Sequence, residues 1–167
     1  MRFQDIPQFT RANYQVDLMW DYLHKWEQNQ LETGLNLEPD FQRAHVWDSS
    51  KQIAYVEYIL KGGVSGKDIY FNHPGWFRNW KGSMDIVDGK QRWQAVKLFL
   101  SDEIPAFQCF YSEYTDRLPL EASFKVHVND LRTRQEVLKW YLDLNSGGVV
   151  HTTEELEKVK MLLEKES

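Results

Sequence analysis

The residues from Asp88 to Arg92 have the types and spacing expected of a site that binds a phosphate group. A short apolar run ends at Asp88-Gly89, and the chain continues directly into a segment whose apolar residues recur at helical spacing. Helix starts bind anions, because their first N–H groups lack partners within the helix and the helix dipole is positive there. Gly89 has no Cβ to hold a ligand away. Lys90 and Arg92 add two cations, and a guanidinium can hold a phosphate through two parallel hydrogen bonds.

A purely structural role for the same turn is the alternative. Asp88 is followed three residues later by Gln91, which fits a capping box, in which two side chains satisfy backbone N–H groups at a helix start. In that arrangement Asp88 itself occupies the amides that a phosphate would need. The local pattern leaves both roles open.

The hydrophobic pattern predicts one α+β domain over residues 1–167, with a core from about 14 to 150. Helices are predicted from Asp17, as N-cap, to about Gln30; between Asp48-Ser49 and Gly62-Gly63; from Gly89 onward; from a capping box at Thr133–Glu136 to Gly147-Gly148; and from about 152 to 166. Strands are predicted at 35–38, 69–71, 84–88, about 107–111 and 124–128. These elements must bring any further site residues to the turn at Gly89.

The segment from His73 to Ser83 is predicted to be a loop that presents aromatic rings and cations together. Its candidate contact residues for a nucleic acid or another partner are Trp76, Phe77, Arg78, Trp80 and Lys81. Rings that alternate with cations can stack on bases and contact phosphates. A hairpin tip folded back onto the domain would have the same composition, so that alternative stays open.

Composition narrows the class of function. A net charge of −5 argues against tight non-specific binding to nucleic acid, which needs a broadly basic surface. The single cysteine, Cys109, excludes an internal disulfide and a cysteine-rich zinc site, and the five histidines lack the spacing of metal ligands. The chain has no membrane-length apolar run and no signal-peptide pattern, so we expect a soluble cytoplasmic protein without a membrane partner.

Three motifs in a fixed order make the chain resemble a known superfamily. They are Pro39-Asp40-Phe41-Gln42-Arg43 with Trp47; then Val87-Asp88-Gly89-Lys90-Gln91-Arg92-Trp93; then Asn145-Ser146-Gly147-Gly148 with Thr152 and Glu155. The series resembles the N-terminal domain of GmrSD-type modification-dependent restriction enzymes, a branch of the ParB/sulfiredoxin superfamily. The hallmark of that branch is a D-G-Q-Q-R motif, from which this chain differs only at Lys90. The resemblance covers roughly residues 14 to 165.

The resemblance implies both a fold and a ligand. The fold would be a single compact ParB/sulfiredoxin-like domain with a small mixed sheet, flanking helices and a C-terminal helical pair. The ligand would be a nucleoside triphosphate whose phosphates lie on the turn at Gly89, with Arg43 approaching from the facing loop. The expected nucleotide-binding residues are Gln42, Arg43, Gly89, Lys90, Gln91, Arg92 and Asn145.

Hydrolysis of the nucleotide with Mg²⁺ is the chemistry that we expect at this site. Phosphoryl transfer depends on charge stabilisation and an oriented water more than on a dedicated nucleophile. Asp88 is the expected metal ligand, ahead of Asp40 and Asp85, because Mg²⁺ characteristically joins one or two carboxylates to phosphate oxygens. Asn145 has the alternative role of a hydrogen-bonding residue at a helix C-terminus. The expected catalytic residues are Asp88, Gln91 and Arg92.

Departures from the superfamily narrow the function. Sulfiredoxin has its catalytic cysteine in the equivalent turn, where this chain has Lys90, so reductase chemistry is not expected. In the restriction enzymes this domain is followed by a helical region and a separate nuclease domain. The 167 residues leave no room for either, so we expect a free-standing nucleotide module. Its expected role is in phage or bacterial DNA restriction or its regulation, in a bacterial or phage-infected cell. The alternative is an inactive DNA- or protein-binding module of the same fold, and a phosphotransferase is a weaker option.

Overall fold

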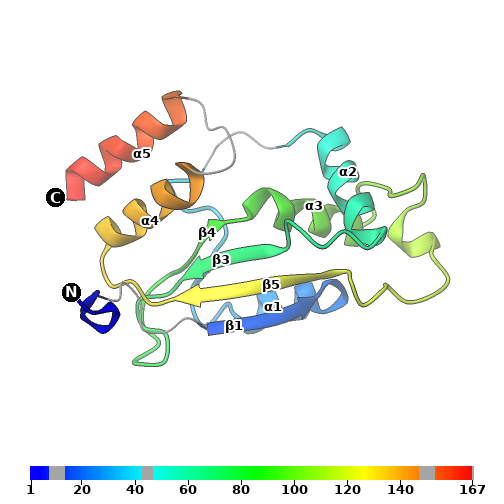
Figure 1. The fold of residues 1–167 in the computed structure, drawn as a ribbon. Helices are drawn as coiled ribbons and strands as arrows, with labels where there is room; N and C mark the ends of the chain where they lie inside the picture. The colour runs from blue at the N-terminus through cyan, green and yellow to red at the C-terminus, as the bar shows by residue number, and fades with distance from the viewer. Residues whose placement is uncertain (8–13, 43–46, 147–152, 167) are drawn as a thin grey trace.

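The computed structural model describes residues 1–7, 14–42, 47–146 and 153–166, in which the strands form one mixed sheet (Figure 1). The strands are β1 (Tyr14–Met19), β2 (Leu35–Asn36), β3 (Asp68–Asn72), β4 (Met84–Asp88) and β5 (Ser123–Asn129). Their order in the sheet is β1-β5-β3-β4-β2. Strand β5 is antiparallel to β1 and parallel to β3, while β4 is antiparallel to β3 and parallel to β2. The expected mixed α+β fold is confirmed.

Helices flank the sheet on both sides. They are α1 (Leu23–Asn29), α2 (Ser49–Leu60), α3 (Lys90–Leu100), α4 (Arg134–Ser146) and α5 (Thr153–Glu166), with short 3₁₀ turns η1 (Phe3–Asp5), η2 (Trp20–Tyr22) and η3 (Tyr111–Glu113). In the described ranges, none of these helices combines the length and the apolar character that a membrane crossing requires.

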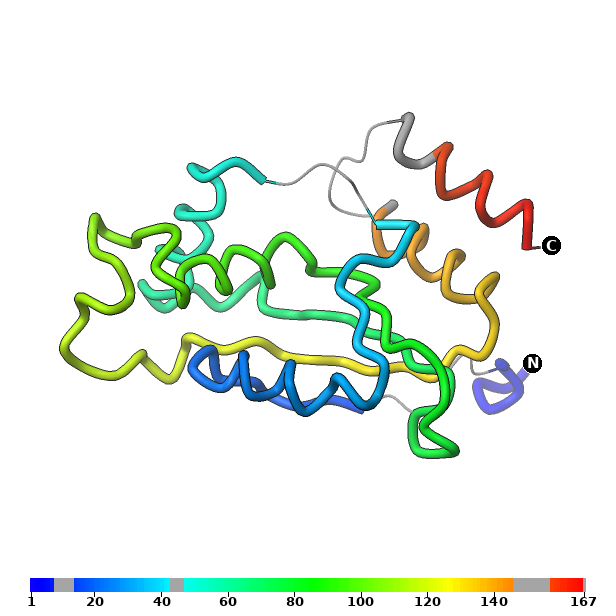
Figure 2. The backbone as a smooth tube through the Cα atoms, turned by 180° about the vertical axis from the view of Figure 1, so that it is seen from behind, coloured from blue at the N-terminus to red at the C-terminus, as the bar shows by residue number. Residues whose placement is uncertain are grey.

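Alternation along β3 shows which helices cover which face. Phe71 contacts Trp26 of α1 and Trp93 of α3, with ring centroids 5.4 and 5.6 Å away. Tyr70 points to the opposite face, where its ring centroid lies 5.9 Å from that of Trp140 in α4. Helices α1 and α3, with α2 packed on α3, therefore cover one face, and α4, with α5 packed on it, covers the other. The rear view shows α1 in front of β1 and β5 and running along them (Figure 2).

Trp93 anchors α3 to the sheet one turn after Gly89. Its side chain is 1% exposed and stacks on Phe124 of β5, with ring centroids 5.5 Å apart and planes 14° apart. The indole Nε1 donates a hydrogen bond to Glu27 Oε1 of α1 at 2.6 Å, and Lys97 Nζ lies 3.2 Å from the same oxygen. These contacts fix where the first turn of α3 lies.

The strand-turn-helix at Gly89 forms as predicted, but the capping box does not. Gly89 is the N-cap of α3, with φ +100°, and it has no side chain that could cap the helix. The Asp88 carboxylate instead accepts a hydrogen bond from Arg92. A Cβ on Gly89 would lie 2.5 Å from the Cδ1 of buried Ile69 and 3.3 Å from the Asp68 carbonyl oxygen, so both the positive φ and the packing against β3 favour glycine here.

Two sequence predictions of regular structure were wrong. The helix predicted from Asp17 begins only at Leu23, because the chain up to Met19 pairs with β5 as strand β1 and Trp20–Tyr22 form the 3₁₀ turn η2. The strand predicted at 107–111 does not form, because Phe107 and Gln108 have φ values of +50° and +63°, which a strand excludes. Only an isolated bridge between Ala106 and Cys109 is present there.

Other local predictions are confirmed. Helix α2 begins at Ser49, next to the start predicted after Asp48-Ser49, and Asp48 caps it by accepting a hydrogen bond from the backbone N–H of Lys51 at 2.9 Å. Thr133 Oγ1 accepts from the N–H of Glu136 at 3.2 Å, which is the first half of the predicted capping box of α4. The predicted helix end at Gly147-Gly148 lies outside the described residues.

His73 is a fully buried polar side chain at the end of β3. Its Nδ1 accepts a hydrogen bond from the backbone N–H of Gly75 at 3.0 Å, so the proton lies on Nε2, which faces the carbonyl oxygen of Thr33 at 2.8 Å. Burial is the main cause that lowers the pKa of His73 below its ordinary value. The imidazole is therefore neutral in the folded protein.

The fold predicts that Gly89→Ala destabilises the protein more than Gly62→Ala. Both glycines have a positive φ, +100° and +93°, but a Cβ on Gly62 would meet no atom within 4 Å. We expect a loss of about 1–2 kcal/mol at Gly62 from backbone strain, and a further loss of about 1–3 kcal/mol at Gly89 from the clash with Ile69. Urea denaturation measures both, and equal losses would contradict the packing role.

The buried neutral His73 predicts that acid weakens the fold. The unfolded chain binds a proton near pH 6.5, whereas the folded imidazole binds it only at lower pH, so stability is lost as the pH falls through about 6.5 towards the lower pKa of the folded protein. His73→Gln should remove part of this slope. Denaturation at several pH values tests it, and an unchanged slope in the variant would refute the assignment.

Candidate functional site

A cavity of about 320 Å³ opens where β4 ends and α3 begins. Its walls come from α2, the loop between α2 and β3, the start of α3, the end of α4 and the loop before α2. The lining residues are Gln42, Trp47, Tyr55, Tyr58, Ser65, Gly66, Asp88, Gly89, Lys90, Gln91, Arg92, Tyr141, Leu144 and Asn145. Every described residue that the sequence predicted for nucleotide binding is among them, as is Asp88, the expected metal ligand. Arg43, which follows Gln42, lies outside the described residues.

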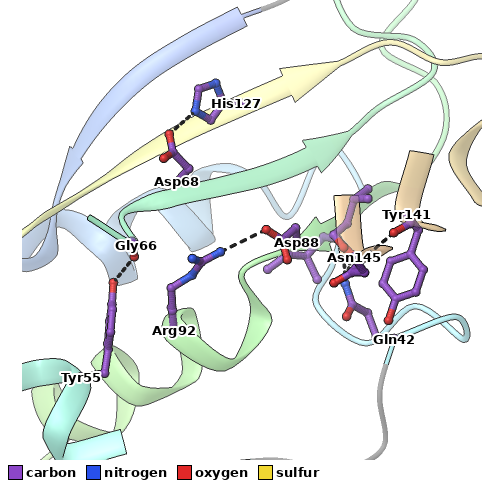
Figure 3. Close-up of polar contacts among 11 residues, drawn as sticks. Gln42, Tyr55, Gly66, Asp68, Asp88, Arg92, His127, Tyr141 and Asn145 are labelled. Atoms are coloured by element: carbon purple, nitrogen blue, oxygen red, sulfur yellow. Dashed lines mark hydrogen bonds and ion pairs between the residues drawn. The ribbon is translucent and has the colours of Figure 1, made fainter. Parts of the chain in front are cut away.

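Arg92 and Asp88 form an ion pair in the cavity. The distance between Arg92 Nη2 and Asp88 Oδ2 is 3.1 Å, and the side chains are 21% and 31% exposed (Figure 3). The two residues are four positions apart across the start of α3, which brings them to the same side of the helix. Both charges therefore face a space that a solute can enter.

Lys90 directs its charge elsewhere. Its side chain is 7% exposed, and its Nζ lies 2.5 Å from Glu38 Oε2, outside the cavity lining. Gln94 Nε2 donates to the other Glu38 oxygen at 3.3 Å. Lys90 is therefore a lining residue of the cavity at the start of α3, but its ammonium group pairs with Glu38 and holds the segment after β2 against α3.

Two glutamines hold the chain on either side of residues 43–46. Gln42 Nε2 donates to the carbonyl oxygens of Ile86 at 2.7 Å and Val87 at 3.0 Å in β4. After the segment, the backbone N–H of Trp47 donates to Gln91 Oε1 at 3.0 Å. Gln42 and Trp47 are thus both tied to the strand-turn-helix. These hydrogen bonds give the two glutamines a positioning role.

One wall of the cavity was not predicted from the sequence. Tyr55 of α2 donates a hydrogen bond from its hydroxyl to the carbonyl oxygen of Gly66 at 2.7 Å, and Tyr58 shares one with Ser65 Oγ at 2.6 Å. Burial raises the pKa of Tyr55 well above its usual value, so its hydroxyl remains a donor at neutral pH. The glycine-rich stretch at 62–66 was the available signal.

Asn145 lies in the last turn of α4 and is buried at the edge of the cavity. Its Nδ2 donates to the carbonyl oxygen of Tyr141, one turn earlier, at 2.7 Å (Figure 3). This is the local hydrogen bonding of a residue at a helix C-terminus. Tyr141 itself packs edge-on against Phe41, with ring centroids 5.1 Å apart, which ties α4 to the loop before Gln42.

The cavity offers one carboxylate to a metal ion. Among its described lining residues only Asp88 is acidic, and the described part of the chain contains no cluster of three His, Cys, Asp or Glu side chains suited to a metal. The other two candidate acids are engaged elsewhere: Asp40 with Arg134 at 2.5 Å, and Asp85 with Asn36 at 3.0 Å. A Mg²⁺ ion here would need most of its ligands from phosphate oxygens and water.

The predicted aromatic contact residues lie away from the cavity. They occupy the connection from the end of β3 to the start of β4, whereas the cavity lies at the opposite end of these antiparallel strands. Trp76 is only 7% exposed and so cannot serve as a contact, while Phe77 and Trp80 are 60% and 45% exposed. Arg78 and Lys81 are also exposed.

Comparison of the chain with protein-family models, with curated proteins and with solved structures found no match. The resemblance to the ParB/sulfiredoxin superfamily therefore stays a prediction, and the function is inferred from the cavity itself.

The hydrogen bond between Tyr55 and Gly66 in the cavity wall predicts an effect on the stability of the protein. Tyr55→Phe leaves the Gly66 carbonyl without the hydroxyl that binds it, so we expect a loss of about 1–2 kcal/mol in the free energy of unfolding. Tyr58→Phe is the matched control, because the Tyr58 hydroxyl is solvent-exposed and water can replace it. Denaturant titration compares the two, and a larger loss for Tyr58→Phe would contradict this account of the wall.

Proposed function

We propose that this chain binds a nucleoside triphosphate in the cavity at the start of α3. The observation that carries the proposal is that residues from distant parts of the chain meet in one cavity. Gln42, Arg92 and Asn145 come from separate parts of the chain, and they line one cavity with the glycine turn between β4 and α3. A positive helix end beside the half-buried guanidinium of Arg92 suits a phosphate group.

The ion pair between Asp88 and Arg92 supports a ligand that carries both signs of charge. A free phosphate would compete for Arg92 but repel Asp88. A Mg²⁺–triphosphate can replace both halves of the pair, because phosphate oxygens bind the guanidinium while the metal binds the carboxylate. The proposed binding mode is therefore an exchange of partners, and Mg²⁺ is part of it.

The aromatic wall supports a ring-bearing ligand over a simple phosphate. Trp47 and Tyr55 line the cavity with ring centroids 5.7 Å apart. Such faces stack on nucleobases with little base preference. The volume of about 320 Å³ is at the lower end of the usual range for small-molecule sites, about 300–1,000 Å³. Part of the nucleotide would therefore project into solvent.

Slow Mg²⁺-dependent hydrolysis is the proposed chemistry. The site has an acid for the metal and a cation for the developing charge, which are the main requirements of phosphoryl transfer. Asp88 and Arg92 would fill these roles, and Gln91 acts through the backbone of Trp47. The motif resemblance supports a role for this nucleotide module in phage or bacterial DNA restriction or its regulation.

Isothermal titration with the four ribonucleoside triphosphates, with and without Mg²⁺, tests the proposal. We expect Arg92→Met to weaken binding by about 10- to 100-fold, the usual value of hydrogen bonds to a charged group. Asp88→Asn should remove the dependence on Mg²⁺.

Lys90→Met is the matched control, because it removes a cation two residues away whose charge is already held by Glu38. It should change affinity by less than about threefold. The proposal fails if none of the four nucleotides binds, or if Lys90→Met weakens binding more than Arg92→Met does.

A further inference from the structure

Four aromatic rings gather at the connection between β3 and β4, and we call residues 74–82 with Tyr14 the aromatic tip. Trp76 lies at its centre, with ring centroids 5.3 Å from Tyr14, 5.6 Å from Phe77 and 4.9 Å from Trp80. Trp76 is buried, whereas Phe77 and Trp80 remain 60% and 45% exposed. The tip therefore has a packed base and presents two rings to solvent.

The two exposed rings are held in place by the backbone. Phe77 and Trp80 both have φ +57°, a left-handed conformation that bulky residues rarely adopt. The carbonyl oxygen of Gly75 accepts hydrogen bonds from the N–H groups of Arg78 at 3.0 Å and Trp80 at 2.9 Å. A Cβ on Gly75 would lie 2.5 Å from the Lys81 nitrogen, so the turn is closely packed. The turn therefore places the two rings next to each other, with centroids 5.7 Å apart.

The tip is positive on a chain that is negative. Residues 73–83 contain no Asp or Glu and two exposed cations, Arg78 and Lys81, whereas the whole chain carries a net charge of −5. The nearest acid in sequence, Asp85, is engaged by Ser83 at 2.6 Å and Asn36 at 3.0 Å. The Arg78 Nη2 atom contacts the Pro74 carbonyl oxygen, and this leaves the rest of the guanidinium at the surface. Positive charge beside exposed aromatic rings suits a negatively charged polymer whose units carry flat ring systems.

We propose that the aromatic tip binds single-stranded nucleic acid, with unpaired bases stacked on Phe77 and Trp80 and phosphates held by Arg78 and Lys81. Single strands are favoured over duplexes because paired bases do not expose their faces, and two cations on an acidic protein neutralise few duplex phosphates. The tip lies at the opposite end of β3 and β4 from the cavity, so this binding site is separate from the nucleotide site.

Fluorescence anisotropy of a labelled oligo-dT of about 12 nucleotides tests the proposal with the full chain. We expect binding at low salt that is much tighter than to a duplex of the same length. Trp80→Ala and Phe77→Ala should each weaken it by about 5- to 150-fold, since stacking on one ring contributes about 1–3 kcal/mol. Arg78→Gln with Lys81→Gln should reduce the slope of log affinity against log salt by about 1.4, because two phosphates are no longer neutralised.

Two controls match these variants. Phe107 is 47% exposed with φ +50°, close to the values for Trp80, but it lies on another loop, so Phe107→Ala should leave binding unchanged. Lys25→Gln with Lys139→Gln removes two exposed cations elsewhere and should affect the salt slope less than the tip pair does.

Three results would overturn the proposal. The first is equal or tighter binding to the duplex, and the second is oligonucleotide binding that survives Trp80→Ala with Phe77→Ala in a folded protein. The third is binding of poly-glutamate through Trp80 with no binding of oligonucleotide, which would assign the tip to an acidic protein partner. Circular dichroism confirms that each variant is folded.

Discussion

The left-handed turn at Gly89 is the constraint on which the sheet and the cavity both depend. With φ +100° the chain reverses from β4 into α3 while the Gly89 backbone lies directly against Ile69 of β3. Glycine is therefore both the pivot of the turn and the N-cap of the helix, so the cap position has no side chain. Asp88 is left to pair with Arg92. The turn that packs Gly89 against β3 thus also leaves Asp88 and Arg92 as the charged pair in the cavity.

Helix geometry separates the two cations of the motif. Lys90 and Arg92 are two residues apart, and side chains at that spacing point to nearly opposite sides of a helix. Arg92 faces Asp88 in the cavity, and Lys90 is buried against Glu38. The sequence prediction treated both as ligands of one phosphate because it counted charges along the chain. The helical angle between the two positions, which the sequence alone supplies, would have separated them.

Local signals predicted most of the elements, and the predictions failed where a pattern was misread or where long-range packing decides the structure. The start of α2 near Asp48-Ser49 and the strand-turn-helix at Gly89 are encoded within a few residues, and both are confirmed. Tyr14, Val16 and Leu18 alternate with polar residues, a strand signal that the helix prediction from Asp17 overlooked, and these residues pair with β5 as strand β1. Long-range packing limits the prediction of the cavity wall of Tyr55 and Gly66, which exists because α2 packs on α3.

The antiparallel pairing of β3 and β4 gives the molecule two separate places for ligands. The turn at one end of this pair begins α3 and opens the cavity, while the connection at the other end carries Phe77 and Trp80. His73 and the short pair between β2 and β4 lie between tip and core, with His73 neutral and hydrogen-bonded at both ring nitrogens. The tip and the cavity are therefore separate sites at opposite ends of one strand pair, and the ligand proposed for each can be tested without the other.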